Sequence, residues 1–182
     1  QTSNWYVQFP GVMSGGETLY LNTTAAITSD NTWATPAATS SVLKVNSQDA
    51  GVSSPSDWVF YCWSEVPGFS KFGSYVGTDS TSGPFIHTEF KPRWILIKCA
   101  SGITTYPWQL YDTQRSPSNP IDLVLTPNSN ISEDGAPYPG LIDANSNGFT
   151  IRSSNATSYL NLNGATYIYA AFAELPTKYF PQ

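Results

Sequence analysis

The chain has 182 residues, of which only 12% are charged, and its formal net charge at pH 7 is −5. This charge argues against a nucleic-acid binder, because contacts with phosphates require clustered Lys and Arg. A single histidine excludes multi-histidine metal sites, and we expect neither a cofactor nor an enzyme. The longest uncharged apolar runs are far too short to span a bilayer, so no membrane insertion is expected.

An internal repeat runs through the chain. The segment WVFYCWSEVP, residues 58–67, aligns without gaps with YIYAAFAELP, residues 167–176. Earlier matches follow the same order, and they pair Trp5 with Trp108, Leu21 with Leu125, Trp33 with Tyr138, and residues 39–47 with residues 145–153. We therefore expect residues 1–67 to be the C-terminal part of a first β unit. Residues 68–182 are then a complete second unit with a C-terminal tail, and the counterpart of residues 69–107 is expected before Gln1.

The predicted elements of the second unit are strands. Residues 69–77 alternate small or polar residues with aromatic ones, and residues 93–99 (RWILIKC) are apolar on both faces, as in a strand covered on both sides. Strands at 107–112 and 121–126 follow, and Asn147-Gly148 predicts a tight turn before the next strand. These short strands predict an all-β fold of antiparallel β-sandwich units in tandem. Cys62 and Cys99 lie in apolar strand-like runs, where we expect free thiols rather than a bridge.

The segment DANSNG, residues 143–148, is similar to the first half of a calcium-binding loop, with Asp143, Asn145 and Asn147 as candidate ligands. The twelfth position is Ser154 instead of a bidentate Glu, so a plain turn is the preferred interpretation.

Carboxylates offer a second kind of chemistry. Four of them could pair for glycoside hydrolysis if the fold set the right separation, namely Asp112, Glu133, Asp134 and Asp143. Nothing local fixes that separation, and we expect no catalytic residues here. Glu65 and Glu174 are expected to be solvated strand ends.

The stretch YCWSEVPGFSKFGSYVGTDSTSGPFIHTEFKPRWILIKC, followed by WQLYDTQRSP and by NGFTIRSS and GATYIYAAFAELPTKY, resembles a repeat domain of tail-fibre-like structural proteins of tailed, largely marine bacteriophages. The resemblance implies a β-rich virion module, assembled in the host cytoplasm and extracellular in the mature particle. Its expected partners are other virion proteins and a host-surface glycan or protein. It also implies a homo-oligomer, with a trimer favoured, and no transferable catalytic residues. The alternative is a carbohydrate-binding module or glycan-active enzyme domain, supported by six Trp and eleven Tyr.

The candidate ligand-binding residues are Trp33, Tyr138 and Tyr106. Trp33 and Tyr138 occupy equivalent Pro-containing connections, NTWATP and GAPYPG. Such a ring either packs down as a lid on the end of the sandwich or projects as a platform for a sugar face or receptor pocket.

Overall fold

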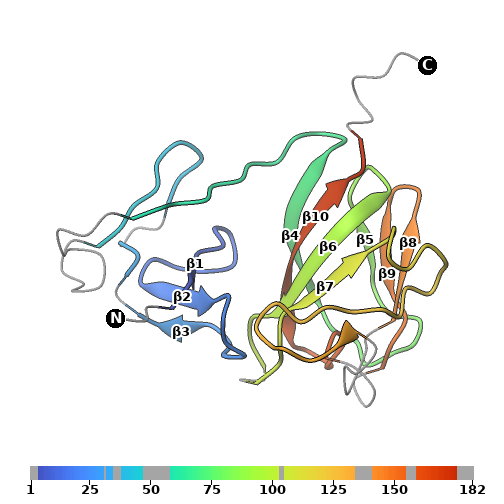
Figure 1. Ribbon diagram of the computed structural model, residues 1–182. Helices are drawn as coiled ribbons and strands as arrows, with labels where there is room; N and C mark the ends of the chain where they lie inside the picture. Colours follow the sequence, from blue (N-terminus) through green and yellow to red (C-terminus); the bar gives the residue numbers. More distant parts are fainter. Residues whose placement is uncertain are drawn as a thin grey trace.

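A computed structural model describes residues 4–30, 32–34, 38–46, 58–102, 105–133, 141–154 and 159–175. These residues form ten strands in three antiparallel sheets and contain no helix (Figure 1). The predicted all-β class is therefore confirmed. Within the same residues, no helix is long and apolar enough to cross a membrane.

The largest sheet has four strands in the order β4, β10, β6, β7. Their bounds are Ser70–Val76, Thr166–Ala173, Pro92–Cys99 and Gln109–Asp112. β10 is the strand on which this sheet depends, because it pairs along its whole length with β4 on one side and β6 on the other. The prediction of a strand covered on both sides at residues 93–99 is confirmed, since β6 contributes to a core on each face.

A second sheet has three strands in the order β5, β9, β8, with bounds Phe85–His87, Gly148–Ile151 and Ile142–Asn145. The expected tight turn joins β8 to β9, and Asn145 lies opposite Gly148 in the register. Gly148 belongs to β9 itself, where an added Cβ would lie 2.1 Å from the carbonyl oxygen of Ile86. A glycine is needed there because the two backbones approach too closely for any side chain.

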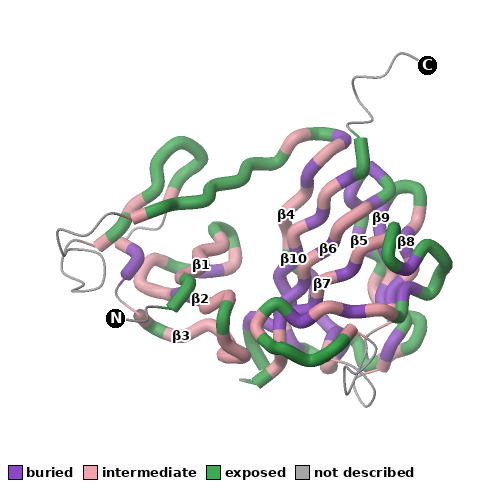
Figure 2. Tube along the Cα trace, in the orientation of Figure 1, coloured by how far each residue is buried: buried purple, intermediate pink, exposed green. Residues whose placement is uncertain are grey.

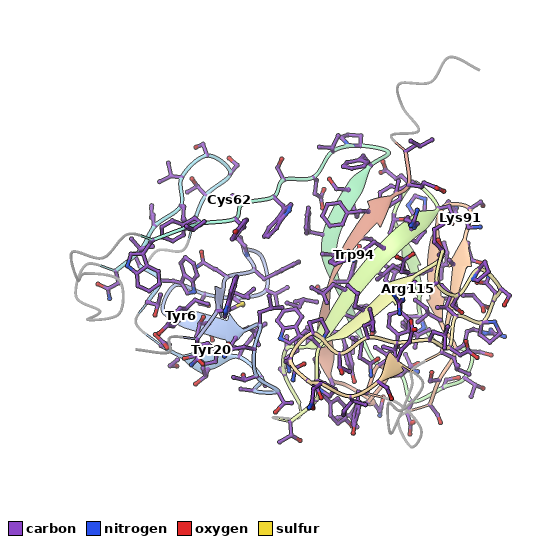
Figure 3. The ribbon with its side chains drawn as sticks, in the orientation of Figure 1. Tyr6, Tyr20, Cys62, Lys91, Trp94 and Arg115 are labelled. Atoms are coloured by element: carbon purple, nitrogen blue, oxygen red, sulfur yellow. The ribbon has the colours of Figure 1, made fainter. Side chains whose placement is uncertain are left out.

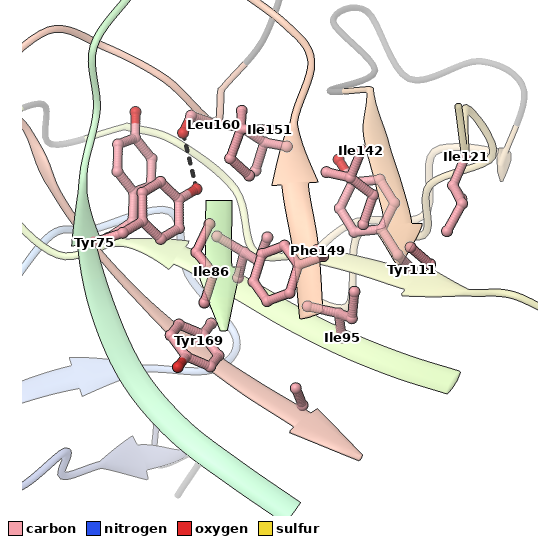
Figure 4. Close-up of a cluster of buried hydrophobic side chains, with 14 of the residues drawn as sticks. Tyr75, Ile86, Ile95, Tyr111, Ile121, Ile142, Phe149, Ile151, Leu160 and Tyr169 are labelled. Atoms are coloured by element: carbon pink, nitrogen blue, oxygen red, sulfur yellow. Dashed lines mark hydrogen bonds between the residues drawn. The ribbon is translucent and has the colours of Figure 1, made fainter. Parts of the chain in front are cut away.

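The two sheets face each other and enclose the main core (Figure 4). Tyr75 of β4 stacks on Tyr167 of β10 with ring centroids 4.9 Å apart, and Phe149 of β9 meets Tyr169 of β10 edge-on at 5.4 Å. The Tyr75 hydroxyl donates to the carbonyl oxygen of Leu160 at 2.8 Å, which satisfies a polar group inside this apolar layer. The described residues between 69 and 173 thus form an antiparallel β-sandwich, as predicted.

The N-terminal part forms a small sheet in the order β1, β2, β3, with bounds Tyr6–Val7, Glu17–Tyr20 and Thr28–Ser29. It packs on the outer face of the large sheet, where a second core cluster joins Met13 and Leu19 to Trp108 and Ile168. The indole Nε1 of Trp108 donates to the carbonyl oxygen of Tyr20 at 2.9 Å across this junction. The large sheet is therefore covered on both faces around Leu96 and Ile168.

A buried lysine lies at the same junction. Lys98 of β6 is fully buried, and its ammonium donates to the carbonyl oxygens of Thr24 at 2.8 Å and Tyr106 at 2.6 Å. Burial lowers the pKa of Lys98 to about 8. The ammonium thereby links the N-terminal part to the outer face of the sandwich.

Candidate functional site

Trp33 is buried, with 6% of its surface exposed. Its indole Nε1 donates to the hydroxyl of Thr18 at 3.1 Å, and its backbone forms an antiparallel bridge with Val45. The Trp33 ring therefore packs as a lid, here over the small sheet, and not as a binding platform. It presents no exposed face to a ligand.

The other two predicted ligand-binding residues have different outcomes. Tyr138 lies outside the described residues. Tyr106 is half-buried and lies against Tyr159, with ring centroids 4.7 Å apart. Its carbonyl oxygen accepts the Lys98 hydrogen bond. Tyr106 is therefore part of the junction that Lys98 links, and the structure does not bring it together with Trp33 into one site.

The residues of the DANSNG segment form a hairpin instead of a cation site. The carboxylate of Asp143 pairs with Arg152 at 3.2 Å, and the side-chain amide of Asn145 donates to the hydroxyl of Thr150 at 3.0 Å. The backbone carbonyl of Asn147 accepts the N–H of Thr88 at 2.9 Å. Each candidate ligand has a structural role in or beside the turn. Among the described residues no group of three or more His, Cys, Asp or Glu is arranged to hold a metal ion.

Three of the four carboxylates considered for glycoside hydrolysis lie in the described part of the chain, and each pairs with a different arginine. Asp112 pairs with Arg93 at 3.0 Å, Glu133 with Arg115 at 2.6 Å, and Asp143 with Arg152. The fourth, Asp134, lies outside the described residues. Burial acts to raise the pKa of Asp112, but hydrogen bonds from backbone amides and Arg93 outweigh it and hold this pKa below its ordinary value. A general acid needs the opposite shift.

Of the two glutamates expected at strand ends, Glu174 follows a strand and Glu65 does not, because residues 58–65 form no strand. Glu174 directly follows β10 and pairs with Arg93 at 3.3 Å, and Glu65 pairs with Lys71 at 3.0 Å. Both carboxylates are largely exposed. Both cysteines are free thiols, as expected, with Cys62 exposed and Cys99 buried.

The feature that the residue-by-residue prediction missed is an exposed apolar segment. Residues 59–65 are all exposed, and they lead away from β4 toward the N-terminal part (Figures 1 and 2). Its large side chains have high exposed fractions: Val59 74%, Phe60 44%, Tyr61 65% and Trp63 66%. The segment forms no strand here, although its sequence is strand-like and matches β10. The repeat itself signals this exposure, because it assigns the segment neighbours whose counterparts in the first unit lie outside residues 1–182.

Local contacts fix the geometry within the exposed segment and at its C-terminal end. The rings of Tyr61 and Trp63 stack, with centroids 6.2 Å apart and planes 20° from parallel. Cys62 lies between them in sequence, on the stretch that joins the two parts of the molecule (Figure 3). At its C-terminal end Val66 forms an antiparallel bridge with Ser70, and the carboxylate of Glu65 accepts the backbone N–H of Phe72 at 3.2 Å.

Half-buried aromatic rings form a second apolar feature, in which Phe72, Trp94 and Phe172 lie on the outer face of the large sheet and Phe69 also packs against the main core. Phe172 is at its centre and meets three rings edge-on, at centroid distances of 6.1 Å for Phe69, 5.7 Å for Phe72 and 5.4 Å for Trp94. We call these four residues the outer aromatic cluster. Two of its members, Phe69 and Phe72, lie at the start of β4 and are close in sequence to the exposed segment.

Residues 1–176 match a protein family described as a domain of unknown function, DUF7483. The chain belongs to this family. No curated protein and no solved structure matches the chain. The match covers the first predicted unit, with its exposed segment, and the second unit up to residue 176, so the family is defined across the arrangement described above.

Proposed function

We propose that this chain is a structural β module of a bacteriophage virion, from a tail fibre or from a surface fibre or decoration. In the mature particle it contributes to attachment to the host surface. The proposal combines the resemblance to tail-fibre-like proteins with the geometry of the exposed segment.

The observation that carries the proposal is the run of large apolar side chains at residues 59–63 of the exposed segment. Contiguous apolar surface of this kind marks an interaction site, because in isolation it promotes aggregation. In a virion protein, neighbouring modules cover such a surface during assembly. The antiparallel sandwich beside it, with few charges and many Ser, Thr and Asn residues, suits a repeated building unit.

The proposed partners are other virion proteins, a host-surface glycan or protein, and further copies of this chain in a trimer. The outer aromatic cluster provides an apolar surface for self-association. Size-exclusion chromatography with light scattering tests this point. A trimer supports the proposal, and a monodisperse monomer at micromolar concentration argues against self-association.

The location is tested by immunogold electron microscopy with antibodies against the purified chain. Gold on the tail or surface fibres of particles that encode this chain is the expected result. Particles that encode the chain and carry no label on any surface, while a known surface protein of the same particles is labelled, would contradict the proposal.

A carbohydrate-binding module is the second candidate, and the exposed Tyr61–Trp63 pair favours it. Stacked, solvent-exposed rings can bind the faces of sugars. A glycan array probed with the purified chain and with Trp63→Ala tests this role, with Trp5→Ala as the matched control because Trp5 is also exposed and lies elsewhere. Glycan binding that is lost in Trp63→Ala and kept in Trp5→Ala would favour this candidate.

A further inference from the structure

We propose that residues 58–66 are a strand-forming docking element whose partner is an antiparallel strand pair of the β4 and β6 type. In the completed sheet this segment takes the central position that β10 has in the second unit. The partner is thus defined chemically as the two strands that flank β10, supplied by a unit of the same family.

The local geometry of the two units supports the correspondence from which this partner is derived. The backbone N–H of Trp5 donates to the side-chain oxygen of Asn22 at 2.9 Å, and that of Trp108 donates to the side-chain oxygen of Asn128 at 2.9 Å. In each unit a strand begins at the next residue, β1 in the first and β7 in the second. The two tryptophans are aligned, and in each unit the N–H bonds an asparagine that lies within three residues after an aligned leucine, Leu21 or Leu125.

A second parallel lies at the hairpins. Asn145 and Gly148 face each other across the turn between β8 and β9. Their counterparts in the alignment are Thr39 and Val42, and the N–H of Thr39 donates to the carbonyl oxygen of Val42 at 2.9 Å. A tight turn thus occurs at the same place in both units. The segment at residues 58–66 follows this turn as β10 follows the hairpin of the second unit.

The two matched segments differ in their neighbours. β10 lies between β4 and β6, and both of these strands come from residues 69–107 of the second unit. The aligned part of the first unit begins at Trp5, the counterpart of Trp108, so it contains no match to β4 or β6. A segment with neither neighbour has no strand to pair with its backbone and leaves its apolar side chains bare, and the exposed fractions show these bare side chains.

The side chains of the segment fit the position of β10 on both faces. Phe60 and Cys62 correspond to Tyr169 and Ala171, which are buried in the sandwich core. These positions require apolar side chains, and both residues meet that requirement.

On the opposite face, Trp63 corresponds to Phe172, the centre of the outer aromatic cluster. Phe172 meets Trp94 of β6 edge-on at 5.4 Å, so a β6-type strand would bring an aromatic ring to Trp63.

The test adds the strand pair to the full chain. A second copy of residues 68–103 is placed directly ahead of Gln1, since Gln1 corresponds to Thr104 at the 103-residue offset between Trp5 and Trp108. The readout is the reaction of Cys62 with a thiol reagent under native conditions, because Cys62 is exposed and Cys99 is buried. In the unmodified chain one thiol reacts rapidly. In the extended chain we expect the rate of Cys62 modification to fall by at least about tenfold, because the reagent then reaches the thiol only when the added strands open locally.

The matched control is the same extended chain with Gly73→Pro and Ile95→Pro in the added copy only. Proline cannot donate to the ladder, so Cys62 should react as fast as in the unmodified chain. If the extended chain is insoluble, residues 68–103 are added as a separate polypeptide and the same rate is measured. Rapid reaction of Cys62 in the presence of the added strands, in whichever of these forms is soluble, overturns the proposal. Protection of Cys62 in the unmodified chain that appears with dimer formation also overturns it, because β4 and β6 of a second copy already flank that copy's own β10 and a different surface then covers the segment.

Discussion

Lys98 is a buried cation that contacts two backbone carbonyl oxygens, and the substitution Lys98→Met tests its contribution to stability. Methionine keeps much of the apolar stem and removes the ammonium that bonds Thr24 and Tyr106. The informative quantity is the pH dependence of the free energy of unfolding. It isolates the ionisation of this one side chain from the packing change that the substitution also makes.

The expected size follows from the shift of the pKa of Lys98 from 10.5 to about 8. Between these values the unfolded chain binds the proton and the folded chain does not, so the free energy of unfolding rises as pH increases. The rise approaches about 1.4 kcal/mol per pH unit and amounts to about 1.5 kcal/mol between about pH 8 and about pH 9.5. Burial raises the pKa of Tyr75 and Tyr111, which reduces stability above about pH 10, so the measurement stops below that range.

Urea unfolding followed by tryptophan fluorescence measures this difference across the pH window. The parent chain should gain stability with pH, and Lys98→Met should lose most of that gain. Lys91→Met is the control, because Lys91 is exposed, and it should keep the slope of the parent chain. A parent chain whose stability is flat over the window, or a Lys98→Met chain with an unchanged slope, would refute the reasoning.

Three further substitutions test the core, the lid and the acidic side of the pH profile. Phe149→Ala should lower the free energy of unfolding by about 3–5 kcal/mol in thermal or urea denaturation, because its ring is fully buried, while the half-exposed Phe85→Ala should cost far less. Trp33→Phe should destabilise the chain by about 1–2 kcal/mol, because the hydroxyl of Thr18 loses a buried donor; an unchanged melting temperature would contradict the lid. Asp112→Asn should be less stable than the parent at pH 7. Because the folded-state pKa of Asp112 is lowered, the difference should close as pH falls below about 4, which acid titration of both chains by circular dichroism would check.

The sequence predicts the sandwich well where a strand meets its neighbours within the same unit. Residues 93–99 are apolar on both faces, and the structure places Ile95 and Ile97 in the main core and Leu96 against the small sheet. Periodicity alone is sufficient here, because both covering layers come from this chain.

The sequence is less informative where the environment comes from distant residues. The role of Trp33 depends on Thr18, 15 residues away, so the ring pattern alone could not separate a lid from a platform. The apolar pattern of residues 58–63 predicts a strand, but the segment forms none, because strand pairing depends on neighbours as well as on the segment. Its counterpart β10 is buried because β4 and β6 flank it.

Hydrogen exchange of the unmodified chain, resolved to residues 58–66 and 166–173 across a dilution series, tests the central claim most directly. The account predicts fast exchange in the first segment and slow exchange in the second, although the two sequences match, because only β10 has strands on both sides. Slow exchange in both segments at every dilution would contradict it.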